Sequence, residues 1–110
     1  MAEQTIGVPE SHGDWIDWNG DVDTYSVHLD WGFAYDFDAL GGGSIDPTLT
    51  LYDPSGAQVA FDDDSGVGLD SHIDFTAWQT GDYTLAVADY GNNDTGSYTL
   101  ETEYNDWLIS

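Results

Sequence analysis

Acidic residues followed by glycines mark one stretch of the sequence where chemistry is concentrated. Asp62, Asp63 and Asp64 are consecutive, and Ser65-Gly66-Val67-Gly68-Leu69-Asp70-Ser71 follows them. Adjacent carboxylates repel one another, whereas glycine lets the backbone adopt positive φ angles that turn carbonyl oxygens inward. Ca²⁺ takes about six to eight oxygen ligands from carboxylates, carbonyls, hydroxyls and water. The stretch therefore predicts a calcium site, and the alternative is a solvated acidic turn.

The segments on either side of this stretch predict where another ligand would come from. Residues 48–53 and 57–62 both alternate between apolar and polar side chains, and Pro54-Ser55-Gly56 between them is a turn signal, so they predict a β-hairpin. If positions near 52 and 59 face each other, Asp46 lies beside Asp64 and Ser65 at the end of the hairpin away from the turn. Like charges placed together destabilise a sheet, and a divalent ion would reverse the sign of that interaction.

The composition narrows the classes of partner. The chain has 110 residues with 22 Asp and Glu, three His and neither Lys nor Arg, which gives a formal net charge of −22. Nucleic acid and anionic membranes are bound mainly through Lys and Arg, so both are excluded as partners. No apolar run approaches the roughly 20 residues of a membrane span, so membrane insertion is excluded as well. The remaining partners are cations, neutral polysaccharides and protein surfaces, and the rival explanation of the acidity is adaptation to high internal salt.

Catalysis finds little support in the residue types present. His12, His28 and His72 are the only imidazole bases, and none lies in a nucleophile motif or at a zinc-ligand spacing. Close pairs of carboxylates arise by chance among 22 acids, and a small sandwich offers little cleft for glycoside hydrolysis. We therefore expect a protein that is not an enzyme.

Aromatic residues and one sequon are weaker candidates for surface sites. Trp15, Trp18 and Trp107 lie outside the alternating segments, where they could contact sugar rings or another protein, or simply cover the ends of the fold. Asn93-Asp94-Thr95 is an N-glycosylation sequon in an expected turn.

Alternation at period two dominates the rest of the chain. Residues 24–30 and 33–39 alternate around Trp31-Gly32 and are expected to pair as a first hairpin, while residues 72–77 form a further strand. Residues 83–87 and 98–100 are expected to pair as the last hairpin. Helical periodicity never extends beyond about two turns. Short strands with turn signals every 8 to 12 residues or so predict an all-β fold, an antiparallel, jelly-roll-like β-sandwich of seven to eight strands.

Several ordered motifs resemble those of a known family. They are Gly20-Asp21-Val22-Asp23-Thr24-Tyr25, Ile45-Asp46-Pro47 with Leu49-Thr50-Leu51-Tyr52-Asp53, Asp62-Asp63-Asp64-Ser65-Gly66, Thr80-Gly81-Asp82-Tyr83, Tyr90-Gly91, and Thr95-Gly96-Ser97-Tyr98-Thr99-Leu100. Together they cover about residues 19 to 104 and resemble the bacterial pre-peptidase C-terminal domain. This resemblance implies a calcium-binding β-sandwich that is appended to secreted proteases and related to the collagen-binding domains of collagenases. It also implies that the metal ligands are Asp21, Asp23, Asp46, Asp62, Asp63 and Asp64.

These observations lead to one division of the chain and two hypotheses of function. We expect residues 1–18 to be an N-terminal extension, with a strand at Thr5–Val8 that could be donated to a neighbouring molecule, and residues 19–110 to be the sandwich. The first hypothesis is a calcium-binding structural or adhesive subunit, extracellular or on the cell surface, that self-associates into filaments or a surface layer. The alternative is an accessory domain that holds a secreted hydrolase on protein or neutral polysaccharide.

Overall fold

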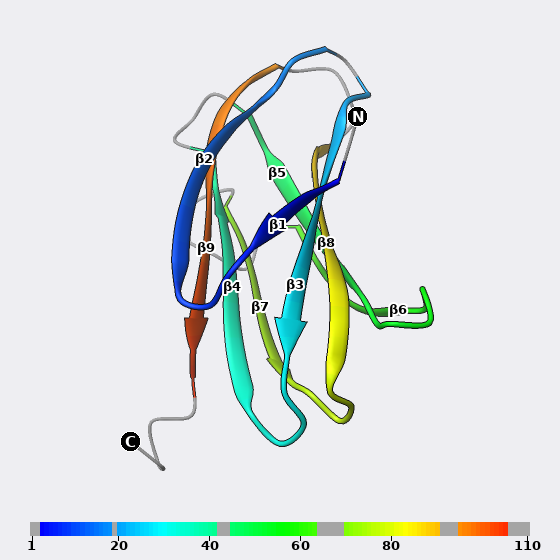
Figure 1. Cartoon of the computed structure of the whole chain (residues 1–110). Helices are drawn as coiled ribbons and strands as arrows, with labels where there is room; N and C mark the ends of the chain where they lie inside the picture. The colour runs from blue at the N-terminus through cyan, green and yellow to red at the C-terminus, as the bar shows by residue number, and fades with distance from the viewer. Residues whose placement is uncertain (1–2, 19, 42–44, 64–69, 91–94, 106–110) are drawn as a thin grey trace.

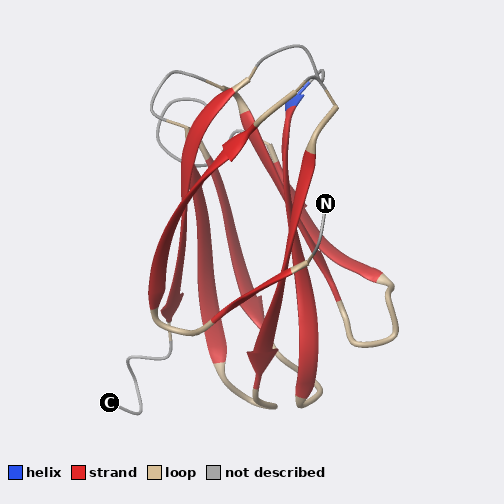
Figure 2. Cartoon of the chain, turned by 45° about the horizontal axis from the view of Figure 1, so that its top comes forward, coloured by secondary structure: helices blue, strands red, loops and turns tan. Residues whose placement is uncertain are grey.

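The computed structural model describes residues 3–18, 20–41, 45–63, 70–90 and 95–105. They form nine strands in two facing sheets (Figures 1 and 2). The five-stranded sheet contains, in spatial order, β1 (Gln4–Ile6), β3 (Val22–Leu29), β8 (Gly81–Asp89), β5 (Pro47–Tyr52) and β6 (Gln58–Asp62). The four-stranded sheet contains β2 (Glu10–Ile16), β9 (Gly96–Tyr104), β4 (Ala34–Leu40) and β7 (Ser71–Thr76). Among the described residues, no helix is long and apolar enough to cross a membrane.

The eight strands from β2 to β9 follow the winding of a jelly roll. They pair antiparallel in a nested series: β2 with β9, β3 with β8, β4 with β7, and β5 with β6. Successive strands therefore alternate between the sheets until the chain turns back at the β5–β6 hairpin. The expected all-β sandwich is confirmed, and β1 adds one parallel strand beside β3.

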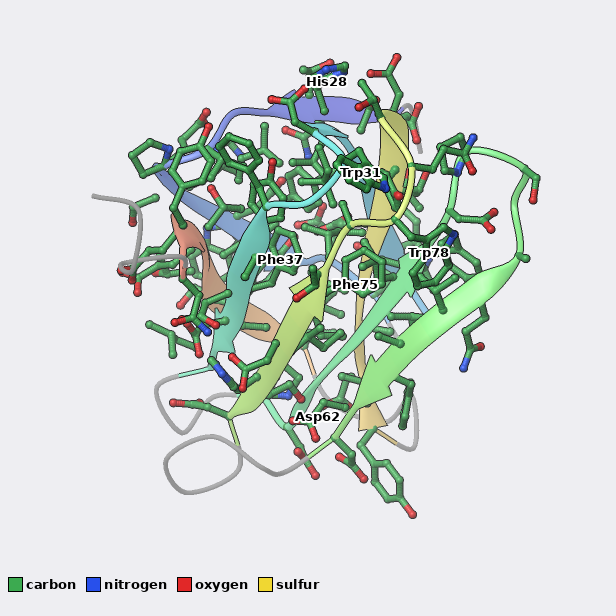
Figure 3. All side chains as sticks on the ribbon, turned by 90° about the horizontal axis from the view of Figure 1, so that it is seen from below. His28, Trp31, Phe37, Asp62, Phe75 and Trp78 are labelled. Carbon is green, nitrogen blue, oxygen red and sulfur yellow. The ribbon has the colours of Figure 1, made fainter. Side chains whose placement is uncertain are left out.

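Alternation correctly identified most core residues of the predicted strands, although Phe33, at an inward position of the 33–39 pattern, is exposed. Tyr25, Val27 and Leu29 of β3 belong to the same buried cluster as Tyr35 and other apolar residues of the opposite sheet. The inner faces of both sheets contribute to this one cluster. Figure 3 shows Phe37 and Phe75 pointing between the layers. Each strand points every second side chain to the inner face, so two facing sheets enclose a single core.

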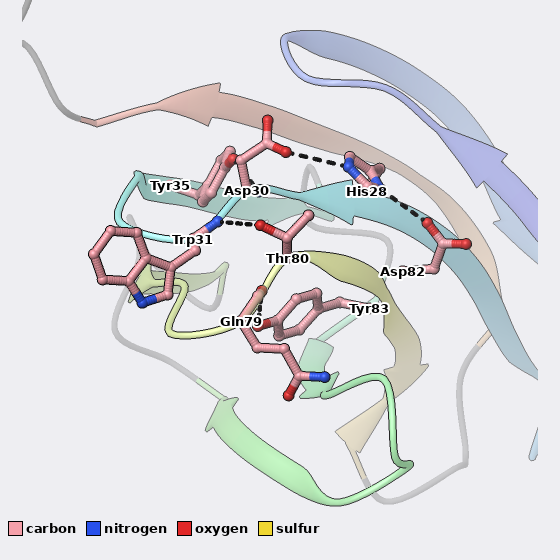
Figure 4. A network of polar contacts seen from close by, with 8 residues as sticks. All are labelled: His28, Asp30, Trp31, Tyr35, Gln79, Thr80, Asp82 and Tyr83. Atoms are coloured by element: carbon pink, nitrogen blue, oxygen red, sulfur yellow. Dashed lines mark hydrogen bonds and ion pairs between the residues drawn. The ribbon is translucent and has the colours of Figure 1, made fainter.

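Two of the three expected hairpins are wrong. Residues 24–30 and 33–39 became β3 and β4, which lie in different sheets, and the same holds for β8 and β9. Alternation identifies the buried face of a strand but not its neighbour, so a short connection can join two sheets as readily as two adjacent strands. The connection at Trp31 does this: the Trp31 amide donates to Thr80 Oγ1 (2.9 Å; Figure 4). The Gly32 amide donates to the Ala77 carbonyl (2.8 Å). The β5–β6 hairpin is confirmed, with Leu49 opposite Asp62.

The expected division after residue 18 does not separate two parts of the fold. β1 pairs with β3 and β2 pairs with β9 of the same chain, and Ile6 and Ile16 are buried in the common core. Glu10–Ile16 was not expected as a strand because its sequence contains a glycine and few residues that favour strands. Residues 4–16 thus give each sheet one edge strand.

Candidate metal centre

Asp21 and Asp23 are buried at the start of β3. Asp23 occupies an inward position in the same row as Tyr25, Val27 and Leu29, and its side chain has no exposed surface. Asp21 immediately precedes the strand and is also buried. Burying a carboxylate in an apolar row costs roughly several kcal/mol of desolvation free energy unless hydrogen-bond donors or a cation compensate it.

Among the described residues, Asp23 has one hydrogen-bond donor for its two oxygens. The Tyr98 hydroxyl lies 2.6 Å from Asp23 Oδ2. Asp23 Oδ1 is shielded from solvent and has no hydrogen-bond partner among the described residues. Burial raises the pKa of Asp23 to about 6, and the negative charges of Asp21, Asp14 and Asp17 add to the increase. Asp23 is therefore a site where a proton or a metal ion would be stabilised.

The series of short O···O contacts from Asp23 to Asp14 has fewer hydroxyl protons than contacts. Tyr98 Oη lies 2.6 Å from Tyr25 Oη, and Tyr25 Oη lies 3.1 Å from Asp14 Oδ2. The contacts from Asp23 through the two phenols to Asp14 number three, whereas two phenols supply two protons. The series is complete only if a carboxyl is protonated, or if a cation takes the place of the missing donor.

The loop from β2 to β3 brings further carboxylates to this position. The Asp17 amide donates to Asp21 Oδ2 (2.9 Å), and the Asp21 amide donates to the Trp18 carbonyl (2.9 Å). Burial acts to raise the pKa of Asp14, but hydrogen bonds from Gln4, the Trp15 amide and Tyr25 outweigh it and hold that pKa below its usual value. Asp14 is therefore stabilised as a carboxylate beside a buried acid that lacks such donors.

A second acidic group lies at the same end of the five-stranded sheet. The β3–β8 pairing ends at Val22 opposite Ala88, so Asp21 and Asp89 follow at one end, and Asp89 is opposite Pro47 of β5. The Asp46 amide donates to Asp89 Oδ1 (3.0 Å). This end is at the top of Figure 1, where β5 and β3 begin and β8 ends.

Asp62 and Asp63 are held at this end by β7. The His72 amide donates to Asp62 Oδ2 (2.8 Å). The Ser71 hydroxyl lies 2.6 Å from the Asp63 carbonyl oxygen and 2.5 Å from that of Pro47. The fold therefore brings the ends of β5, β6, β7 and β8 together, and it gathers carbonyl oxygens as well as carboxylates.

The predicted site residues are thus partly placed. Asp21 and Asp23 form one group and Asp46, Asp62 and Asp63 form the other, at a common end of the sheet. The predicted ligand Asp64, the sequon residue Asn93 and Trp107 lie outside the described residues. Trp15 and Trp18 are exposed around the β2–β3 loop.

Sequence reasoning missed Asp14, Asp17, Asp89 and Tyr98. A usable signal existed for Asp89, because it continues the inward row of Tyr83, Leu85 and Val87. An acid in an apolar row marks a buried charge that needs a partner. Asp14 and Asp17 carried no such signal, since Asp14 reaches Tyr98 through the β2–β9 pairing and Asp17 reaches Asp21 through the loop between β2 and β3.

Comparisons with known proteins identify the same fold. The sequence profile described as bacterial pre-peptidase C-terminal domain matches residues 21–89. The crystal structure of the pre-peptidase C-terminal domain of collagenase from Bacillus anthracis superposes with a TM-score of 0.77 at 23% identity, covering 92% of this chain and 94% of that one. No curated protein matches the sequence.

Two periplasmic inhibitors of g-type lysozyme, both named PliG, share the fold at lower identity. The protein from Salmonella Typhimurium has a TM-score of 0.64 at 16% identity, covering 93% of this chain and 98% of that one. The protein from Aeromonas hydrophila has a TM-score of 0.56 at 14% identity, with 92% and 99% covered. These two likenesses show the fold alone.

Proposed function

The chain belongs to the bacterial pre-peptidase C-terminal domain family, and from that premise we propose that it is a calcium-binding module of the extracellular space. The family is a non-catalytic accessory domain, found in this comparison on a collagenase. In the accessory role, the module would hold a secreted hydrolase on protein or on a neutral polysaccharide. The charge of −22 favours partners that are cationic or uncharged.

Calcium binding is supported above all by Asp23 Oδ1, which has no hydrogen-bond partner among the described residues. This oxygen is buried, and the neighbouring acids Asp21, Asp14 and Asp17 raise the free energy of its ionised form. Carboxylate oxygens are the ligands that Ca²⁺ prefers, so the donor set fits a hard divalent cation. Asp21 and Asp23 would hold the ion, which would supply the positive charge that this chain lacks.

The second acidic group is a candidate for another ion. Asp46, Asp62, Asp63 and Asp89 present carboxylates beside carbonyl oxygens at one end of the sheet. Asp64, which lies outside the described residues, stays a predicted ligand of this group. The number of ions bound per chain would show whether the two groups act together.

Thermal unfolding with calcium and with chelator tests the proposal. At a calcium concentration of 100 times the dissociation constant, binding adds about 2.7 kcal/mol to the free energy of unfolding. Asp23→Asn should remove most of this increment while leaving the chelator-treated protein at least as stable, because the amide ends the repulsion from Asp21. Asp82→Asn is the matched control, since that aspartate is exposed on the other end of β8. Equal melting midpoints with calcium and with chelator at low ionic strength would refute the proposal.

Self-association is a second candidate function, and the position of β1 is the observation that favours it. β1 has three residues and pairs with β3 alone, in parallel, at the edge of its sheet. A short edge strand is held by few hydrogen bonds, so it could leave β3 and pair with a second molecule. Calcium near the contacts would reduce repulsion between subunits of such high charge.

An engineered disulfide between β1 and β3 tests whether assembly requires β1 to leave its own chain. Thr5 and Ser26 are register partners, and the chain has no cysteine. Light scattering and electron microscopy of the Thr5→Cys, Ser26→Cys variant should show polymers in calcium only after reduction of the disulfide. The unmodified chain should form polymers with calcium and lose them with chelator. A monomer in all of these conditions would rule out assembly by this route.

A further inference from the structure

The outer face of the four-stranded sheet carries a histidine among carboxylates, away from the candidate calcium centre. In the strand register, Asp36 of β4 is opposite Asp74 of β7, and Asp38 is opposite His72. On the other side of β4, the same two aspartates are opposite Glu103 and Glu101 of β9. These positions alternate with buried ones, so all six side chains lie on one face.

Both ring nitrogens of His72 face carboxylates, one carboxylate at Nδ1 and two at Nε2. Nδ1 lies 2.6 Å from Asp38 Oδ1. Nε2 lies 2.8 Å from Asp74 Oδ1 and 3.9 Å from Asp36 Oδ1. One ligand atom from each of Asp36, His72 and Asp74 lies within 4.8 Å of the others. Two carboxylates therefore converge on a single ring nitrogen, and a third occupies the other nitrogen.

Asp36 provides a separate indication that a cation belongs in this cluster. Its Oδ1 has less than 1 Å² of accessible area and no hydrogen-bond partner among the described residues. The shielded oxygen belongs to the carboxylate that approaches His72 Nε2, so its orientation matches that of a ligand.

We propose that Asp36, His72 and Asp74 bind a divalent transition metal ion such as Zn²⁺. Imidazole favours Zn²⁺, Cu²⁺ or Ni²⁺ over Ca²⁺ and Mg²⁺, which prefer oxygen ligands alone. Two ligands at zinc-binding distances from one ion lie at most about 4.2 Å apart, and both separations from His72 Nε2 meet that limit. Water would complete the coordination on this open face.

Asp38 is a positioning residue in this site. A carboxylate that accepts a hydrogen bond from one nitrogen of a histidine fixes the tautomer and the ring orientation, which directs the other nitrogen to the metal. The Nδ1–Asp38 contact does this for His72.

His28 offers a matched control within the same chain. It also contacts two aspartates, but Nδ1 lies 3.1 Å from Asp82 and Nε2 lies 3.2 Å from Asp30, as Figure 4 shows. Each nitrogen faces a different carboxylate, so two acids never share one nitrogen as they do at His72. The His28 side chain is 59% exposed, against 30% for His72.

Zinc titration of the full chain by calorimetry, in excess Mg²⁺ and Ca²⁺, tests the site. The excess ions occupy purely oxygen-lined sites, so the remaining signal reports coordination by nitrogen. We expect one Zn²⁺ per chain, with at least a tenfold loss of affinity in His72→Ala and about a 10- to 100-fold loss in Asp38→Asn. His28→Ala should retain the affinity of the unmodified chain. An affinity in the unmodified chain no higher than in His72→Ala, or an equal loss in His28→Ala, would overturn the proposal.

A measurement on the unmodified protein guards against misfolded variants. Imidazole nitrogen resonances followed by NMR during zinc addition should move at Nε2 of His72 and stay in place at His28. Perturbation of His28 alone, or of neither residue, would contradict the assignment. Asp23 lies in the other sheet, so loss of calcium binding at Asp23 would leave this result unchanged, and the two proposals can fail separately.

Discussion

A carboxylate inside a β-sandwich needs a proton, a donor or a cation, and Asp23 has one hydrogen-bond donor among the described residues for its two oxygens. Asp14 shows the opposite case, because Gln4, Tyr25 and the Trp15 amide all donate to it. The two aspartates are joined through Tyr25 and Tyr98. Neighbouring acids of the same type therefore differ in what they can bind, and the difference comes from their donors.

Removing the hydroxyl of Tyr98 should expose the cost of burying Asp23. Tyr98→Phe leaves both oxygens of Asp23 without a hydrogen-bond donor among the described residues, so we expect the free energy of unfolding to fall by about 1–3 kcal/mol. Urea unfolding in chelator measures the change. Tyr104→Phe is the control, because Tyr104 lies on the same strand with an exposed side chain. An equal effect of the two substitutions would show that the Tyr98–Asp23 hydrogen bond contributes nothing.

At the scale of the strands, the ends of β4 and β5 depend on close backbone packing. Gly41 follows β4, and its amide donates to Asp70 Oδ1 (2.9 Å). A Cβ atom at Gly41 would lie 2.6 Å from the Ile45 carbonyl oxygen and 2.8 Å from Pro47 Cδ. The backbone can approach this closely only because residue 41 has no side chain.

Gly41→Ala should therefore destabilise the fold by about 1–3 kcal/mol, the usual cost of overpacking. Gly13→Ala is a suitable comparison, because a Cβ there would meet its nearest neighbour, the Tyr98 carbonyl oxygen, at 3.9 Å. Thermal unfolding of both variants should show a lower midpoint for the first and little change for the second. A Gly41→Ala variant as stable as the parent would mean that the β4–β5 connection relaxes without cost.

At the scale of the whole molecule, repulsion between like charges opposes the fold. The chain carries a formal charge of −22, and the Cα radius of gyration is 13.2 Å. The Debye length falls from about 30 Å at 0.01 M salt to about 10 Å at 0.1 M. Carboxylates on opposite sides of the molecule thus repel one another at low salt and are screened at moderate salt.

The melting midpoint should rise with NaCl or KCl over that range and then level off. Calcium, added at a concentration too low to change the screening, should raise the midpoint further, because it acts at defined carboxylates. Scanning calorimetry with matched ionic strengths separates the two effects. If molar KCl replaces calcium completely, the acidity reflects adaptation to salt, and the specific calcium sites fail.

The sequence alone determined the fold class and most of the inner face. A strand exposes alternate side chains to opposite sides, so Tyr25, Val27, Leu29 and Phe37 could be assigned to the core without knowledge of their neighbours. The β5–β6 hairpin was also predictable, because it is the one nested pair closed by a local turn. The family resemblance rested on the same local motifs.

Only the tertiary structure decided which strands are neighbours, and the binding geometry follows from that choice. The pairs β2–β9, β3–β8 and β4–β7 join residues far apart in the chain, and alternation carries no information about such partners. Asp14 meets the Asp23 network, and His72 meets Asp36 and Asp38, solely through these pairings. A sequence displays its acids one by one, whereas the register of distant strands determines which of them share a proton or a metal ion.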